Sequence, residues 1–245
     1  MCLLALFFRV VEDSPLVAGA NREEAYERGG EPPRILEGPI RAVSGLDPSA
    51  GGTWFGVNEH GLVAAVTNRR RSPLPEEPRS RGLLTRDLLD CSSVKQATLK
   101  AVDELQSGKY AGCNLLLADR DQVTAIHFGA WLQVIPLPVG IHVMTSAGDV
   151  NSTADPRIAQ AREWLLEREP TSAADCLKTL RKLCAFTGEP PMCLRGPHRG
   201  TVSSTLLALA CPLSRSTMLH AQGAPDKTPY KEISPLLRDI FPSDL

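Results

Sequence analysis

The order of apolar segments along the chain predicts an α+β fold with mostly antiparallel sheets. Several predicted strands are joined by short polar turns, which is typical of antiparallel pairing. The predicted helices come in two pairs between groups of strands, and this grouping favours stacked layers over a parallel sheet with alternating helices. No glycine-rich phosphate loop follows a strand, which also argues against a doubly wound nucleotide-binding fold.

The first half of the chain is expected to form two hairpins and one pair of helices. Turn-like residues at 12–15 and 58–61 join the strands of each hairpin. The segment 21–52 is polar and then rich in Gly and Pro, so it is predicted to be loop. Helices are expected at 82–89 and 94–106, and the second has an apolar face after a serine cap. The predicted strands are residues 3–11, 16–20, 53–57 and 62–67.

The second half is expected to add strands around a second helix pair. Asp155 and Pro156 open a helix that runs to about residue 168, with Asp as its cap and Pro in its first turn. The next helix spans 173–184. From Gly223 the chain is polar and is predicted to be a loosely packed tail over 223–245, within one domain that covers 1–245. The predicted strands are residues 113–118, 122–128, 131–136, 141–145, 202–210 and 217–221.

Composition excludes several functional classes. The 245 residues carry a formal net charge of −1, which gives no electrostatic reason to expect nucleic acid or an anionic membrane as a partner. No apolar run is long enough for a transmembrane helix. The seven cysteines are odd in number and lack C-x-x-C spacing, so neither a disulfide framework nor a metal site is predicted and a reducing, cytoplasmic setting is expected.

Cys2 follows the initiator methionine directly and precedes an apolar strand. Removal of Met1, which a small second residue favours, would give Cys2 a free α-amine. The ordinary pKa of such an amine is about 7.7–8.0 and that of a thiol about 8.5, so the amine can take the proton from its own thiol. Cys2 is therefore a candidate nucleophile, and we expect the mature chain to lack Met1. The alternative is a small buried thiol without a function.

Three stretches together resemble one known family. They are Met1-Cys2 before an apolar strand, Ala20-Asn21-Arg22-Glu23-Glu24, and the segment from Gly45-Leu46-Asp47 through Gly51-Gly52-Thr53-Trp54 to Val66-Thr67-Asn68. This pattern is similar to the NRDE family, also called the transport and Golgi organisation family, with Glu in place of Asp in its signature. Asp155-Pro156-Arg157 and Gly200-Thr201 before Ser203-Ser204-Thr205 also resemble family segments.

The resemblance implies an N-terminal-nucleophile hydrolase-like fold, a four-layer αββα sandwich of two stacked antiparallel sheets. Cysteine-dependent acylases of this kind use an N-terminal Cys to attack an amide. By that analogy Cys2 is the expected catalytic nucleophile, and Asn68 the amide of the oxyanion hole. The acylases also carry an Arg, an Asp and a second Asn, and the matching positions here hold Ala20, Glu23 and Ser146.

Further residues are expected to shape a cleft beside Cys2, although a turn, an ion pair or core packing are the alternatives. For Trp54 in particular, packing in the core is the stronger expectation. Cys2 and Asn68 are predicted to meet this cleft from strand ends, where polar side chains can lie beside buried strands. The residues assigned to ligand binding are Asn21, Arg22, Glu23, Trp54 and Ser146.

Two functions follow from the resemblance. Family members are linked with intracellular haem handling, so binding and trafficking of haem is the first expectation, with haem as a bound ligand and no required cofactor. The missing polar groups of the acylases favour this role. The alternative is an N-terminal-cysteine amidohydrolase or acyltransferase that acts on an amide or acyl compound. The residues leave open which small molecule binds and whether the chain forms oligomers.

Overall fold

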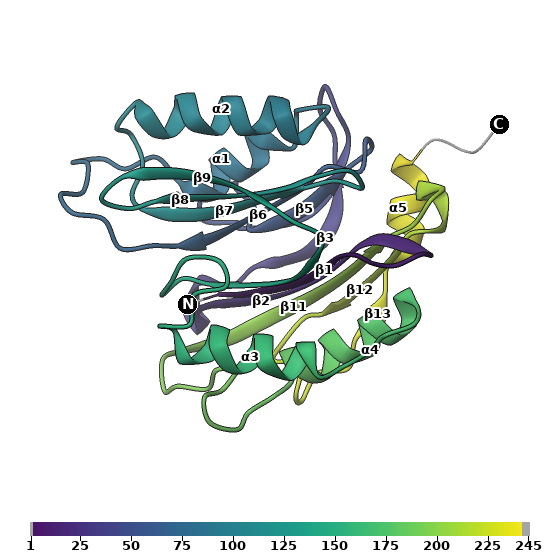
Figure 1. Cartoon of the computed structure of the whole chain (residues 1–245). Coiled ribbons are helices and arrows are strands. Elements are labelled where there is room, and N and C mark those ends of the chain that lie inside the picture. Colours follow the sequence, from purple (N-terminus) through teal and green to yellow (C-terminus); the bar gives the residue numbers. More distant parts are fainter. Residues whose placement is uncertain (1, 242–245) are drawn as a thin grey trace. The chain divides into compact units, whose positions relative to one another are not determined.

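The computed structural model describes residues 2–241, and these residues form two compact units. One unit comprises Met1–Gly29 and Pro138–Leu245, as far as these ranges are described, and the other comprises Gly30–Leu137. Each unit contains one antiparallel sheet with helices packed on it (Figure 1). The expected α+β class is therefore confirmed, whereas the prediction of one domain over the whole chain stays a prediction.

The first unit is built on an antiparallel sheet that has, within the described residues, the strand order β10-β1-β2-β11-β12-β13. The two N-terminal strands lie near its centre, so each is hydrogen-bonded on both sides. The strands are β1 (Leu3–Val11), β2 (Ser14–Ala25), β10 (Gly140–Thr145), β11 (Arg199–Leu209), β12 (Thr217–Ala221) and β13 (Lys231–Glu232).

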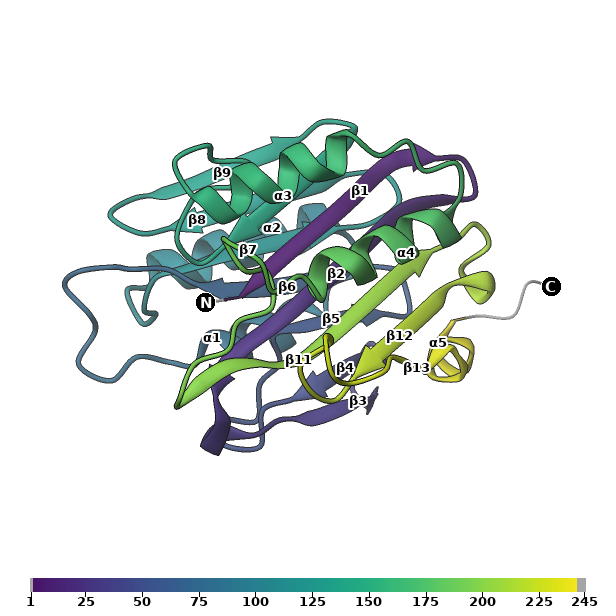
Figure 2. The ribbon, with the colours of Figure 1, turned by 90° about the horizontal axis from the view of Figure 1, so that it is seen from below.

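Two helices, α3 (Pro156–Leu166) and α4 (Ala173–Cys184), cover one face of this sheet (Figure 2). Side chains alternate between the two faces of a strand, so Leu3, Val17 and Leu206 share the helix-covered face. They form one buried cluster with Ile158 and Leu180 of the helices. The residues next to them in sequence lie on the opposite face, and this parity decides where each candidate site residue points.

Local signals define both helices. The Asp155 side chain accepts a hydrogen bond from the Arg157 backbone at the start of α3, with Pro156 in the first turn. Ser172 caps α4 in the same way through Asp175. The expected bounds of α4 are confirmed, and α3 ends two residues before its expected end.

The second unit contains, over Gly30–Leu137, a sheet of order β3-β4-β5-β6-β7-β8-β9. Helices α1 (Arg81–Leu88) and α2 (Val94–Gln106) pack on one face through a buried cluster that includes Leu84, Ala101 and Leu115. The strands are β3 (Glu31–Leu36), β4 (Ala42–Leu46), β5 (Phe55–Asn58), β6 (Val63–Asn68), β7 (Cys113–Ala118), β8 (Val123–Phe128) and β9 (Leu132–Leu137).

The predicted loop at 21–52 is wrong in three places. Strand β2 continues to Ala25, because β11 pairs with residues 22–25. β3 and β4 occupy a Gly- and Pro-rich stretch that has little local strand signal. β3 lies at the sheet edge and pairs only with β4, which is why it tolerates Pro32 and Pro33.

The prediction of a loosely packed tail from Gly223 is also wrong for the described residues. This segment forms β13 and the helix α5 (Ser234–Ile240). Leu237 and Ile240 are fully buried, so α5 contributes to the core of its unit. The short helix carries only two such residues, which is too few to make a recognisable apolar period. Residues 242–245 lie outside the described part of the chain.

Trp54 precedes β5 and is half-buried, so it is less enclosed than the expected core position. Its ring lies against Gly45 of β4, where an added Cβ would come within 2.6 Å of a ring carbon. We expect Trp54→Ala to lower the free energy of unfolding by about 2 kcal/mol, below the 3–5 kcal/mol typical of a buried aromatic residue. Urea denaturation measures this value.

Gly45→Ala provides the control for Trp54. The new methyl group has to displace the ring, so Gly45→Ala should cost more stability in the wild-type chain than in the Trp54→Ala background. Equal costs in the two backgrounds would contradict the packing of the ring on Gly45.

All seven cysteines lie within the described residues and are free thiols. Cys2 is half-buried and Cys211 exposed, whereas the other five are buried. None of the helices between residues 2 and 241 has the length and hydrophobicity needed to span a bilayer.

Candidate functional site

Cys2 immediately precedes β1 and lies between two neighbouring strands. Leu3 pairs with Asn21 of β2 on one side and with Thr145 of β10 on the other. Continuing both registers by one residue brings Cys2 beside Arg22 and Ser146. Three of the predicted site residues therefore come from separate parts of the sequence to one end of the same sheet.

Burial decides the protonation state of the Cys2 thiol. Burial raises the pKa of this thiol above its ordinary value, and the nearby Glu23 carboxylate raises it further. A hydrogen bond from the Glu23 backbone and the positive charge of Arg22 oppose this rise. The thiol is thus neutral near pH 7 in the chain that still carries Met1, and it needs a base before it can react as a nucleophile.

Arg22 is buried, and it lies opposite Cys2 when the β1–β2 register is continued by one residue. Its guanidinium donates a hydrogen bond to the backbone carbonyl of Gly29, which holds the side chain near the end of β2. Ala20 lies on the same face two residues earlier, opposite Leu4. On this face β2 therefore carries Ala20 and, two residues later, Arg22 as the source of a guanidinium.

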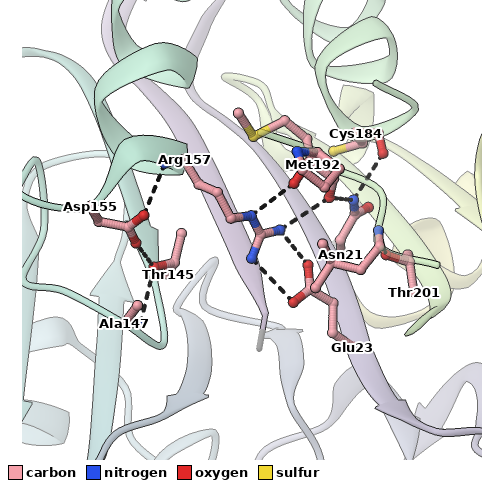
Figure 3. A network of polar contacts seen from close by, with 11 residues as sticks. Asn21, Glu23, Thr145, Ala147, Asp155, Arg157, Cys184, Met192 and Thr201 are labelled. Atoms are coloured by element: carbon pink, nitrogen blue, oxygen red, sulfur yellow. Dashed lines mark hydrogen bonds and ion pairs between the residues drawn. The ribbon is translucent and has the colours of Figure 1, made fainter. Parts of the chain in front are cut away.

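Glu23 points to the helix-covered face and forms a buried ion pair with Arg157 of α3 (Figure 3). The guanidinium nitrogens lie 2.5 Å and 3.3 Å from the two carboxylate oxygens, so the pair is bidentate. The Glu23 side chain is 1% exposed and that of Arg157 is 9% exposed. Burial raises the pKa of the Glu23 carboxyl, and Arg157 opposes that rise.

Arg157 is itself held by the loop that follows α4. Its guanidinium donates to the backbone carbonyls of Pro191 at 2.9 Å and Met192 at 3.2 Å. Asp155, two residues earlier, is hydrogen-bonded to Thr145 at the end of β10 (Figure 3). No site role for Arg157 follows from the sequence alone. Its position just after a helix cap, in a segment that resembles the family, is the feature of the sequence that could have indicated a role for Arg157.

Asn21 also points to the helix-covered face and is almost completely buried. Its amide donates hydrogen bonds to the backbone carbonyls of Cys184 and Met192, each at 2.9 Å (Figure 3). These bonds tie β2 to the end of α4 and to the following loop. Asn21 thus anchors the elements around the Glu23–Arg157 pair, and its direct contact with a ligand stays a prediction.

The two remaining predicted residues belong to the Gly30–Leu137 unit. Asn68 is the last residue of β6, opposite Cys113 of β7, and its side chain is exposed. Trp54 is half-buried before β5. The predicted approach of Asn68 to Cys2 stays a prediction.

Other features of the first unit do not involve the predicted residues. A pocket of about 170 Å³ lies between α3 and α4 and is lined mainly by apolar side chains, among them Trp164, Leu183 and Phe186. None of the predicted site residues lines it. Within residues 2–241, no group of three or more His, Cys, Asp or Glu side chains is arranged to hold a metal ion.

Three solved structures with a similar fold are named an acylase, an amidase and a hydrolase. Penicillin V acylase from Agrobacterium tumefaciens is 15% identical, with a TM-score of 0.57 over 90% of this chain and 83% of that one. The N-acylethanolamine-hydrolyzing acid amidase orthologue of Caenorhabditis elegans is 14% identical, with a TM-score of 0.58 over 84% and 92%. A variant of the conjugated bile acid hydrolase of Clostridium perfringens is 11% identical, with a TM-score of 0.52 over 96% and 93%. The predicted N-terminal-nucleophile hydrolase-like fold is therefore confirmed.

Sequence relatives identify the family. Over 107 residues the chain is 34% identical to the bovine and human transport and Golgi organization protein 2 homologues. The matched region covers 42% of this chain and only 38% of each relative. The family model for Transport and Golgi organisation 2 matches residues 1–183, which is most of the chain. With the signature at Asn21-Arg22-Glu23-Glu24 beside Cys2, the chain belongs to the Transport and Golgi organisation 2 family.

Proposed function

We propose that this chain is an N-terminal-cysteine hydrolase or acyltransferase that acts on an amide or acyl compound. The observation that carries the proposal is the alignment of Cys2 with Arg22 and Ser146 at one end of a central strand. The fold shared with penicillin V acylase and the acid amidase supports it, since both of those proteins are named for reactions at amide bonds.

The proposed chemistry begins with removal of Met1, which lies outside the described residues. The α-amine of Cys2 then takes the thiol proton, and the thiolate attacks the acyl carbon. The departing amine receives the proton as the amide bond breaks, which leaves a thioester on Cys2. Water, or an acceptor amine in a transferase, cleaves the thioester and restores the thiol. Ser146 is the proposed donor to the negatively charged oxygen.

The raised thiol pKa makes the α-amine necessary to this scheme. Before Met1 is removed the thiol has no such base, because the nitrogen of Cys2 is part of a peptide bond. We therefore expect iodoacetamide to alkylate Cys2 faster at pH 7 after treatment with methionine aminopeptidase than before. Mass spectrometry of the N-terminal peptide measures both Met1 loss and alkylation, with the exposed Cys211 as internal standard. Equal rates before and after treatment would contradict the mechanism.

Arg22 should set the pH at which Cys2 becomes reactive. Its positive charge favours the thiolate, so Arg22→Ala raises the thiol pKa and slows alkylation near pH 7. Above the thiol pKa both proteins carry a thiolate, and the two rates should converge. Glu23→Gln removes a negative charge and should shift the pH profile the opposite way. A profile that is unchanged by both substitutions would remove the electrostatic basis of the site.

A direct assay completes the test of function. A panel of acyl-aminocoumarin amides with acyl groups of different length should reveal release of the fluorescent amine. Cys2→Ala should abolish it, and a thioester adduct on Cys2 should be detectable by mass spectrometry. Release that persists in Cys2→Ala would show that a different group is the nucleophile.

Haem binding is the second candidate, and the same alignment favours it. A cysteine thiolate can serve as an axial ligand of haem iron, and a guanidinium such as that of Arg22 pairs well with carboxylates such as the haem propionates. Titration with haemin should then give a saturable Soret shift that Cys2→Ala removes. A spectrum that does not saturate, or that is identical in Cys2→Ala, would count against haem ligation at this site.

A further inference from the structure

Four polar residues form a row across one end of the first unit's sheet. Arg22 of β2 pairs with Ser203 of β11, and Cys2 lies between Arg22 and Ser146 by the register described above. The order across β10, β1, β2 and β11 is therefore Ser146, Cys2, Arg22 and Ser203. Arg22 and Ser203 lie at the face opposite α3 and α4, and the continued registers place Cys2 and Ser146 at the end of this row.

The hydroxyls of Ser146 and Ser203 are buried and have no hydrogen-bond partner among the described residues. Ser203 as a whole is 3% exposed. A buried hydroxyl without a partner costs free energy, so most such groups in proteins are hydrogen-bonded. Two such hydroxyls lie in one row, on either side of the candidate nucleophile, where a ligand would supply the missing partner.

The residues that follow Ser203 on β11 have hydrogen-bonded side chains, so the missing partner is specific to Ser203 within this part of the strand. Ser204 points to the helix-covered face, where its hydroxyl lies 2.6 Å from that of Tyr230 and 3.3 Å from the Ala20 carbonyl. The Thr205 hydroxyl is hydrogen-bonded to Nδ1 of His220, at a distance of 2.9 Å. The β2–β11 register shifts between Thr201 and Ser203, and such an irregularity often redirects a side chain beside a site.

We propose that Ser203 binds an oxygen atom of the substrate, at a distance from the bond that Cys2 attacks. This inference rests on the proposed function. Two strand spacings separate Ser203 from Cys2, about 9–10 Å. The substrate class is therefore an acyl compound whose chain carries a carboxylate or another oxygen acceptor about that far from the reacting carbonyl. Cys2 and Ser146 are half-buried whereas Arg22 and Ser203 are buried, so the acceptor end lies inward.

Two thiol reagents of equal length test this placement. N-bromoacetyl-4-aminobutanoate carries a carboxylate at its far end, and N-butyl-bromoacetamide ends in a methyl group. In the processed full-length protein, Cys2 should react faster with the acid. Ser203→Ala should lower the ratio of the acid rate to the butylamide rate about three- to tenfold, the effect of one lost hydrogen bond.

Ser204→Ala is the matched control on the same strand. It removes a hydroxyl that has partners, so it should lower the melting temperature and leave the rate ratio unchanged. Ser203→Ala should lower the rate ratio and leave the melting temperature unchanged, because its hydroxyl has no protein partner to lose. A rate ratio that Ser203→Ala leaves intact would overturn the proposal.

Equilibrium binding separates this inference from the proposed function. N-acetyl-4-aminobutanoate has the same far end and cannot alkylate, and its affinity can be measured by NMR titration. If Cys2 proves inert while Ser203→Ala still weakens this ligand several-fold, the hydrolase proposal fails and the binding role stands. If Cys2 reacts and neither measurement responds to Ser203→Ala, the binding role fails and the hydrolase proposal stands.

Discussion

Arg157→Met is expected to lower the free energy of unfolding by about 3–5 kcal/mol, the usual cost of leaving a buried charge without its partner. Glu23 would remain 1% exposed without a counter-ion, and the carbonyls of Pro191 and Met192 would each lose a donor. Urea denaturation at pH 7 measures the loss. The double variant Glu23→Leu/Arg157→Met should recover most of it, because apolar side chains of similar volume can replace a buried ion pair.

The pH dependence gives an independent check. Without Arg157 the pKa of the folded Glu23 carboxyl rises further above its unfolded value of about 4.3. A folded state that binds more protons than the unfolded state loses stability as the pH rises. The deficit of Arg157→Met should therefore be smallest near pH 4 and grow above it.

Arg195 provides the matched surface control. It also forms a bidentate pair, with Asp226 at 2.5–2.6 Å, but its side chain is 47% exposed. Exposed pairs contribute about 0–1 kcal/mol, so Arg195→Met should have a small effect. Similar losses for the two variants would contradict the view that burial gives the Glu23 pair its importance.

Gly52→Ala is expected to cost about 3 kcal/mol or more, at the upper end of the range for overpacked sites. An added Cβ would lie 2.3 Å from the Gly82 carbonyl carbon and 2.5 Å from the Leu83 nitrogen. Both are backbone atoms at the start of α1, so no rotamer change can relieve the clash. The hydrogen bond from the Thr53 N–H to the Gly82 carbonyl, 2.9 Å long, would be disturbed as well.

Gly51→Ala is the control for this prediction. Gly51 has a φ of +69° and open space around its Cβ position, so alanine meets backbone strain and no clash. That strain costs roughly 1–2 kcal/mol. Thermal or urea unfolding of the two variants should therefore rank Gly52→Ala as the more damaging, and the reverse order would contradict the close approach of the two backbones.

The elements that were predicted correctly have a recognisable pattern within their own residues. Residues 94–106 and 173–184 have a cap residue followed by an apolar stripe, and both are helices with those bounds. Residues 3–11 form an apolar run interrupted only by Arg9, and they are a strand. The failures at β3, β4 and the extension of β2 share one cause. Those segments become strands because a neighbouring strand pairs with them, and a neighbour distant in sequence leaves no local pattern.

The same distinction between local pattern and tertiary pairing applies to the candidate site. The sequence by itself determined the family, the unusual Cys2 and the signature at Asn21-Arg22-Glu23, because these depend on residue identity and spacing. Only the tertiary structure decided that Arg22 shares a face with Ser203 while Asn21 and Glu23 point to the helices. Strand parity and register separate neighbouring side chains in this way. Arg157 and Ser203 join the same region because α3 and β11 pack beside β2, more than 130 residues away along the chain.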